Sequence, residues 1–270
     1  MQITAHSSGL RPIRCIVINL DRTPERLQKM REQFDLIGFD LHRFRAVDGL
    51  AMPDSEINAF NLMRPRNFDP PVPWRPGTIG CFLSHFGVWQ EVARSSDPYV
   101  AIFEDDLHIS SDLRLLLATD SWIPQDYDVI RLETSTNRVR LGAPGMIGGL
   151  DRKLHPVKST TWCAGAYILS REAARKFVSV SPLYHYPVDY MMFSLEDSPV
   201  ARSLTVGQVL PAPCVQDKYL PDQDAREDFE STVQIDDATG SMTGIPALFA
   251  RLPRAAYKLF LHYRKIPYRA

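Results

Sequence analysis

Residues 13–25 read IRCIVINLDRTPE, and this stretch indicates the class of fold. Its first eight residues form an apolar run rich in β-branched side chains, which is typical of a buried strand. Thr23, Pro24 and Glu25 then supply an N-cap hydroxyl, a proline for the first helical position and an early acid. The stretch therefore predicts a strand followed directly by a helix.

A second strand follows the helix. Apolar residues recur at helical spacing up to a glycine that is typical of a helix C-terminus; they are Leu27, Met30, Phe34 and Ile37, followed by Gly38. Residues 41–47 then have the pattern of a strand, which ends at Asp48 and Gly49. A strand–helix–strand unit implies that its two strands run parallel.

The same alternation continues along the chain. The predicted elements are a helix over 77–94, strands over 99–103, 128–132 and 161–169, a helix capped by Ser170, and a strand over 204–210. Alternating strands and helices predict an α/β protein, a three-layer fold with a mostly parallel central sheet. Ligands bind such sheets at the carboxyl ends of the strands, so we expect the chemistry just after residues 20, 47 and 103.

Composition excludes several classes. The chain has 270 residues, of which 44% are hydrophobic and 23% charged, and its net charge of −1 gives no reason to expect nucleic-acid binding. No GxGxxG follows the first strand and no Walker A sequence occurs, which argues against a nicotinamide enzyme and a P-loop NTPase. The widely spaced cysteines predict reduced thiols without a structural zinc site; they are Cys15, Cys81, Cys163 and Cys214.

The C-terminal segment differs from the rest of the chain in its charge. Residues 242–270 contain six basic residues and no acidic ones, whereas 1–241 carries about −7. Basic segments with interspersed aromatic side chains bind anionic membrane surfaces, so 246–270 could make a peripheral membrane contact. The alternative is a helix that packs on the body and complements its acidity. No run of about 18 apolar residues predicts a membrane span.

Three consecutive acids, Glu104, Asp105 and Asp106, follow the apolar strand 99–103. Adjacent carboxylates repel one another, and partial burial increases the cost. On an extended segment Glu104 and Asp106 point to one side and Asp105 to the other. Their oxygen ligands suit Mg²⁺ or Mn²⁺, so we expect a metal site. The alternative is a solvated turn.

Other polar residues have two interpretations each. Asp21 and Asp48 follow predicted strands, and each could bind ribose hydroxyls or a base edge. The alternative for Asp21 is an early helix cap, and the alternative for Asp48 is a turn with Gly49. His85 lies on an apolar helix, where a lone histidine is usually a satisfied core residue. Ser84 is a poor nucleophile candidate because no GxSxG motif surrounds it.

Together these segments resemble glycosyltransferase family 25, the lipooligosaccharide galactosyltransferase-like family. The matching pieces occur in order over about 13–216; they are VINLDR at 17–22 with Glu25 and Arg26, RAVDG at 45–49, GTIGCFLSH at 77–85, IFEDD at 102–106, AYILSR at 166–171 and PVD at 187–189. This chain has Thr78 where the family commonly has Glu, which affects the expected donor or acceptor contact.

The resemblance implies a GT-A type fold, with one catalytic domain over 1–241 and a tail over 242–270. Its nucleotide-binding half would span about 13–135 and its acceptor-binding half about 136–220. Mn²⁺ or Mg²⁺ would bind to Glu104 and Asp106 against the diphosphate of a UDP-sugar. Separately from the resemblance, Gln216 follows the last predicted strand and could reach the metal or the diphosphate. The expected donor-binding residues are Asn19, Asp21, Arg22, Asp48, Gly77, Ser84, Glu104 and Asp105.

Family members mostly use UDP-galactose and form β linkages, so the resemblance implies inversion and a saccharide or glycolipid acceptor such as a lipopolysaccharide core. Inversion needs a general base, for which we nominate Asp189, a lone acid in an apolar and aromatic segment; the alternative is that it caps the next helix. His185 is a second candidate.

Two other functions remain open: a sugar-1-phosphate nucleotidyltransferase and a non-catalytic protein of the same fold. The first usually has a basic Gly-rich loop after the first strand, where this chain has Asp21, Arg22, Thr23 and Pro24.

The N-terminus shows no apolar signal region. We therefore expect a bacterial-type cytoplasmic enzyme, peripheral on the inner face of the membrane.

Overall fold

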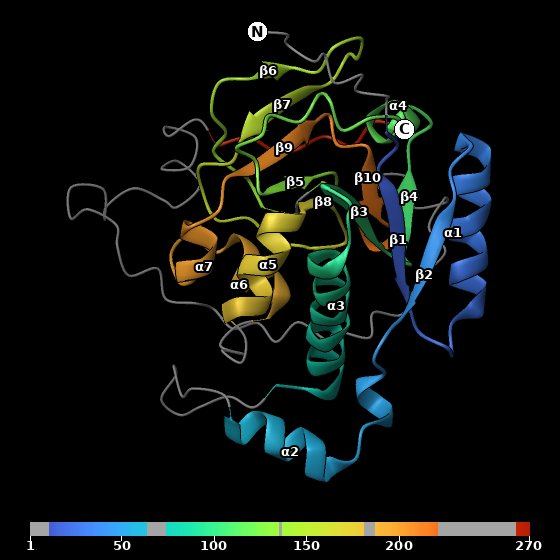
Figure 1. Ribbon diagram of the computed structural model, residues 1–270, viewed down its shortest axis with the longest axis vertical. Helices are drawn as coiled ribbons and strands as arrows, with labels where there is room; N and C mark the ends of the chain where they lie inside the picture. Colours follow the sequence, from blue (N-terminus) through green and yellow to red (C-terminus); the bar gives the residue numbers. More distant parts are fainter. Residues whose placement is uncertain (1–10, 64–73, 135–136, 181–186, 221–262) are drawn as a thin grey trace, which may run out of the picture.

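A computed structural model describes residues 11–63, 74–134, 137–180, 187–220 and 263–270. It forms an eight-stranded sheet with helices on both faces (Figure 1). The first half contains β1 (Arg14–Asn19), α1 (Pro24–Ile37), β2 (Leu41–Arg45), the 3₁₀ turn η1 (Gly49–Ala51), α2 (Asp54–Met63), α3 (Pro76–Arg94), β3 (Tyr99–Glu104), β4 (Leu107–Ile109), α4 (Leu113–Leu117) and β5 (Val129–Arg131).

The second half of the chain completes the sheet and one cover layer. It contains β6 (Gly145–Met146), β7 (Lys153–Pro156), β8 (Ala166–Ser170), α5 (Arg171–Val180), α6 (Val188–Phe193), α7 (Pro199–Arg202), β9 (Val206–Leu210), β10 (Cys214–Gln216) and η2 (Asp217–Tyr219). The sheet order is β2-β1-β3-β8-β5-β9-β7-β6, and β10 and β4 form a separate antiparallel pair.

The predicted α/β class with a mostly parallel sheet is confirmed. Within the described part of the chain, β1 runs parallel to β2 and β3, and β5 runs parallel to β9. Only β8 and β7 run against the other six strands of the large sheet. The predicted strand–helix–strand start of the chain forms as expected.

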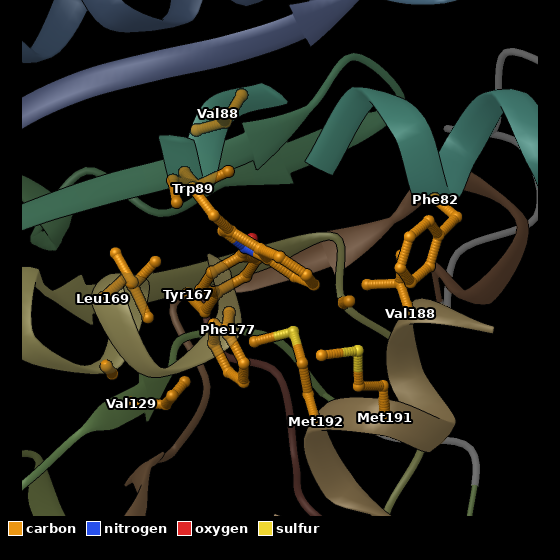
Figure 2. Close-up of a cluster of buried hydrophobic side chains, with 14 of the residues drawn as sticks. Phe82, Val88, Trp89, Val129, Tyr167, Leu169, Phe177, Val188, Met191 and Met192 are labelled. Carbon is orange, nitrogen blue, oxygen red and sulfur yellow. The ribbon is translucent and has the colours of Figure 1, made fainter. Parts of the chain in front are cut away.

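The two faces of β1 explain why its sequence is apolar throughout. Ile16 and Ile18 face a core shared with α3, α5 and α6, whereas Cys15 and Val17 face a core shared with α1 and α4. A strand covered on both faces has no solvated side, so alternation disappears. Figure 2 shows the first of these cores, in which Trp89 lies beside Tyr167 and Phe177.

Local details of the helix ends agree in part with the sequence. Gly38 ends α1 in the left-handed conformation, with φ of 74°, and Ser170 Oγ accepts a hydrogen bond from the Ala173 N–H at 3.0 Å. Thr23 is the N-cap residue of α1 but does not cap it with its side chain. The predicted side-chain cap was wrong because the hydroxyl is used elsewhere. Its oxygen accepts from Asn19 Nδ2 and its proton is donated to Asp105 Oδ2, at 3.1 Å each.

The strand predicted over 161–169 begins only at Ala166. The preceding carbonyls of Trp162 and Cys163 accept hydrogen bonds from the buried guanidinium of Arg131, at 2.7 and 2.6 Å. These carbonyls are thereby satisfied outside the sheet, and the chain forms a loop instead of a strand.

The last eight residues pack on the body. Ile266 is buried, Arg264 bridges to Val139, and Arg269 pairs with Asp151 at 2.8 Å. This fits the packing alternative for that end of the tail, whereas the rest of 246–270 lies outside the described residues. Within the ranges that the structure describes, no helix has the length and apolarity to cross a membrane.

Helix α3 begins in close contact with η1. A Cβ on Gly49 would lie 1.7 Å from the Pro76 carbonyl oxygen, and one on Gly80 would lie 2.6 Å from the Val47 carbonyl oxygen. Only glycine permits this approach. The contact brings Asp48 to the start of α3, at the mouth of the cavity described below.

We expect Gly49→Ala to lower the free energy of unfolding by about 1–3 kcal/mol, because the added methyl group meets backbone that cannot move freely. Denaturant unfolding followed by circular dichroism measures the change. Gly148→Ala is the matched control, since a Cβ there meets nothing within 4 Å. Equal stability of the two variants would contradict the close packing of α3 on η1.

Candidate functional site

A cavity of about 200 Å³ opens at the carboxyl ends of β1 and β3. Its walls come from segments far apart in the chain, which meet there: the loop after β2, the start of α3, the end of β3, the start of α6, and the residues at and after the end of β10 (Figure 1). This is the position expected for ligand binding in an α/β sheet. The predicted site residues that line it are Arg22, Asp48, Gly77, Ser84, Glu104, Asp105, Asp106, Asp189 and Gln216.

The acids after β3 alternate as predicted. Gln216 Nε2, at the end of β10, donates to Glu104 Oε2 at 2.9 Å and lies 3.5 Å from Asp106 Oδ1. Asp105 turns the other way, where its Oδ2 accepts from Asn19 Nδ2 at 2.7 Å. Glu104 and Asp106 therefore share one side of the strand end, and Asp105 connects the strand to β1.

The two acids on the cavity side differ in their protonation. Burial and the neighbouring Glu104 charge raise the pKa of Asp106 to about 7. Burial also acts to raise the pKa of Glu104, but the hydrogen bond and charge of His85, the charge of Lys218 and the Gln216 amide outweigh it, so this pKa is lowered. Near neutral pH the pair therefore retains part of one proton, which a bound cation would displace.

The acids fit a hard divalent cation. The two carboxylates and the amide oxygen of Gln216 are ligands that Mg²⁺ and Mn²⁺ prefer. Gln216 directs its amide N–H toward both acids, and the O/N assignment of such an amide depends on its partners. The amide dipole thus occupies the place between the acids that a cation would take over.

A buried hydrogen-bond chain supports Glu104. Trp89 Nε1 donates to the Tyr167 hydroxyl at 2.9 Å, this hydroxyl lies 2.9 Å from His85 Nδ1, and His85 Nε2 lies 3.3 Å from Glu104 Oε1. His85 is buried and satisfied, as expected for a core histidine. It also contacts the cavity acid, which its place on an apolar helix did not reveal.

Asp189 has features of both predicted roles. Its carboxylate lines the cavity at the first turn of α6 and accepts from the backbone N–H of Tyr190 at 2.9 Å and of Cys163 at 3.4 Å. Burial raises its pKa, and these two N–H groups oppose the rise. Cys163 has φ of 73°, a strained conformation for a residue other than glycine. His185, the second candidate base, lies outside the described residues.

The expected donor-binding residues separate into two groups. Arg22 and Asp48 line the cavity and pair with each other at 2.8 Å. Ser84 also lines it, but its hydroxyl donates to the Gly80 carbonyl at 2.6 Å and accepts from the Val47 N–H at 2.8 Å. This hydroxyl therefore holds α3 against the loop after β2.

Asn19 and Asp21 do not line the cavity. Asn19 is buried and holds Asp105, and its Oδ1 accepts from Arg43 Nε at 3.0 Å. Asp21 is exposed and pairs with Arg43 and Arg45, at 2.6 Å each. These contacts give both residues structural roles at the end of β1, and their direct contact with a nucleotide stays a prediction.

Sequence reasoning missed two charged groups here. Lys218 lines the cavity after β10, and its charge acts on both Glu104 and Asp106. Glu133 is buried behind the cavity: one oxygen accepts from the Gly165 N–H at 2.7 Å, and the other has no hydrogen-bond partner among the described residues. Burial raises the pKa of Glu133 to about 8. Neither residue belongs to a recognisable motif.

The chain is similar to known glycosyltransferases in sequence. The family model of glycosyltransferase family 25 (LPS biosynthesis protein) matches residues 13–192. The lacto-N-neotetraose biosynthesis glycosyltransferase LgtE of Neisseria meningitidis serogroup B is 30% identical over 212 residues, 75% of this chain and 74% of that protein. LgtB of the same strain is 32% identical over 148 residues, 52% of this chain and 53% of that protein.

More distant similarities extend the comparison. A glycosyltransferase 25 family member of Anopheles gambiae is 28% identical over 237 residues, 81% of this chain and 39% of that protein. The apo-form glycosyltransferase GlyE of Streptococcus pneumoniae aligns over 68% of this chain and 45% of that chain, with 9% identity and a TM-score of 0.31, a likeness that supports no conclusion.

The match to this chain thus spans about half of LgtB and three quarters of LgtE. The family match covers the segments that carry the cavity acids, from β1 to α6. By that match, the chain belongs to glycosyltransferase family 25.

Proposed function

We propose that this protein is an inverting glycosyltransferase that moves a hexose, with galactose as the first choice, from a UDP-sugar to a saccharide acceptor such as a lipopolysaccharide core. The proposal rests on one observation: a single cavity is lined by an acid pair, Glu104 and Asp106, and by a third, partly buried carboxylate, Asp189. Family membership implies a nucleotide-sugar donor, and the names of LgtB and LgtE refer to lacto-N-neotetraose biosynthesis.

The acid pair would hold the metal ion. Glu104, Asp106 and Gln216 would bind Mn²⁺ or Mg²⁺, which when bound neutralises charge on a departing diphosphate. Lys218 adds a protein cation beside the same acids and can pair with a phosphate oxygen. Arg22 lies at the opposite wall with Asp48, where it can reach the nucleotide.

Asp189 would act as the general base. Its carboxylate accepts the proton of the acceptor hydroxyl while the hydroxyl oxygen bonds to the anomeric carbon and the bond from that carbon to the diphosphate oxygen breaks. The raised pKa of Asp189 increases its basicity, and the N–H groups of Cys163 and Tyr190 fix its orientation. A carboxylate separate from the acid pair leaves room for attack from the opposite face of the sugar.

The proposal also includes where the enzyme works in the cell. A lipid-linked acceptor would suit a cytoplasmic enzyme that binds the inner face of the membrane through its basic segment 246–270. The support is compositional: six basic residues and no acids over 242–270.

We expect Asp106→Asn to reduce Mn²⁺-dependent UDP release by about 100-fold or more, because removing one ligand charge weakens both metal binding and its effect on the leaving group. A screen of UDP-sugars with an acceptor saccharide supplies the assay. Asp126→Asn, an exposed acid outside the cavity, is the control. Turnover by Asp106→Asn within about threefold of the control would refute the metal assignment.

We expect Asp189→Asn to lower kcat by about 10²- to 10⁴-fold while UDP binding, measured by calorimetry, is retained. In the native protein, kcat should fall on the acid side of the pH profile, through a pKa above the ordinary range of Asp, because only the ionised carboxylate accepts a proton.

The pH at which kcat falls, here called the acid limb of the profile, shows whether Asp189 or Asp106 is the group that titrates. A limb due to Asp106 moves to lower pH as the Mn²⁺ concentration rises, because the ion competes with the proton. A limb due to Asp189 stays in place. The exposed Asp197→Asn is the matched control from the same segment. Turnover by Asp189→Asn within about tenfold of this control would exclude Asp189 as the base.

A further inference from the structure

We propose that Cys81, His85 and Glu104 form a binding site for a soft divalent cation of the zinc class, and that an ion bound there inhibits the transferase. The inhibitory consequence rests on the proposed function, because Glu104 is also a ligand of the proposed catalytic ion. The binding itself depends only on the three side chains.

The fold brings the three groups together from two elements. Cys81 and His85 lie four residues apart on α3, which places them on one face of the helix. Glu104 meets them from the end of β3, with its Oε1 3.9 Å from Cys81 Sγ and 3.3 Å from His85 Nε2. All three ligand atoms lie within 4.8 Å of one another, and all three residues line the cavity.

These separations approach those of a tetrahedral zinc site. Zinc binds thiolate sulfur at about 2.3 Å and histidine nitrogen or carboxylate oxygen at about 2.0–2.2 Å, so neighbouring ligand atoms stand about 3.3–3.6 Å apart. The two separations from Glu104 Oε1 are already close to this range. The cavity leaves a fourth position open to water.

The surroundings of His85 suit a metal ligand. Its Nδ1 lies 2.9 Å from the Tyr167 hydroxyl, which also accepts from Trp89 Nε1 (Figure 2 shows Trp89 and Tyr167 together). A hydroxyl oxygen has two lone pairs, so it accepts from both donors when Nδ1 carries the proton. In this tautomer the Nε2 lone pair faces Glu104, so that a bound ion takes the place of the hydrogen bond between Nε2 and Glu104 Oε1. The hydrogen bond at Nδ1 fixes the ring orientation.

The ligand types distinguish this site from the catalytic one. Sulfur and imidazole favour Zn²⁺ and Cd²⁺, whereas the oxygen ligands of Glu104, Asp106 and Gln216 favour Mg²⁺ and Mn²⁺. Binding exchanges the thiol proton for the ion, so that Zn²⁺ and Cys–SH give (Zn–S–Cys)⁺ and H⁺. Both ions need Glu104: its Oε1 faces Cys81 and His85, and its Oε2 faces Gln216. An ion bound at Oε1 draws on the charge of this carboxylate and thereby weakens binding of the catalytic ion at Oε2.

Cadmium titration of the full-length protein tests binding without any activity assay. We expect an ultraviolet charge-transfer band from a cadmium–thiolate bond in the native protein, and its loss in Cys81→Ala. Cys163→Ala, which removes the other cavity thiol, is the matched control and should keep the band. A band that survives in Cys81→Ala, or that disappears in Cys163→Ala alone, would overturn the site.

Zinc titration at a fixed Mn²⁺ concentration tests the inhibition, with each variant compared with its own zinc-free rate. The zinc concentration for half inhibition should rise at least about tenfold in Cys81→Ala and stay unchanged in Cys163→Ala. Equal inhibition of both variants would overturn the regulatory claim. If no UDP-sugar is turned over, the proposed function fails, and the cadmium band still decides the site.

Discussion

Repulsion between two partly buried carboxylates determines how the site is arranged. Glu104 and Asp106 stand on one side of the end of β3, and burial raises the cost of ionising both. Three features reduce this repulsion: the hydrogen bond from the Gln216 amide, the positive charge of Lys218 and partial protonation of Asp106. Such an arrangement would bind a divalent cation in exchange for that proton, and this is the role that we propose for it beside a nucleotide-sugar donor.

Other elements of the fold position the residues that surround Glu104 and Asp106. The parallel strands β1 and β3 end side by side, and Asn19 of β1 holds Asp105 so that its two neighbours face the cavity. The small sheet of β4 and β10 brings Gln216 from far along the chain. Buried Arg131 holds the loop that carries Cys163, and the backbone N–H of Cys163 donates to Asp189, which also lines the cavity.

The sequence predicted what depends on local pattern and missed what depends on pairing. Period-two alternation placed Glu104 and Asp106 together, and the apolar run with Pro24 and Gly38 located the first strand and helix. No local pattern reveals that β8 runs against its neighbours, that Lys218 joins the acids, or that Glu133 is buried behind them. Cysteine spacing excluded a zinc motif, yet α3 and β3 together assemble three ligand types across the fold.

We propose that a cation displaces the proton that Asp106 holds beside Glu104. Calorimetric titration of Mn²⁺ with UDP present, in buffers of different ionisation enthalpy, measures that proton directly. We expect binding with release of close to one proton at pH 6, and of little at pH 8, because the pKa of Asp106 without the ion is about 7. Absence of binding, or binding at pH 6 without proton release, would contradict it.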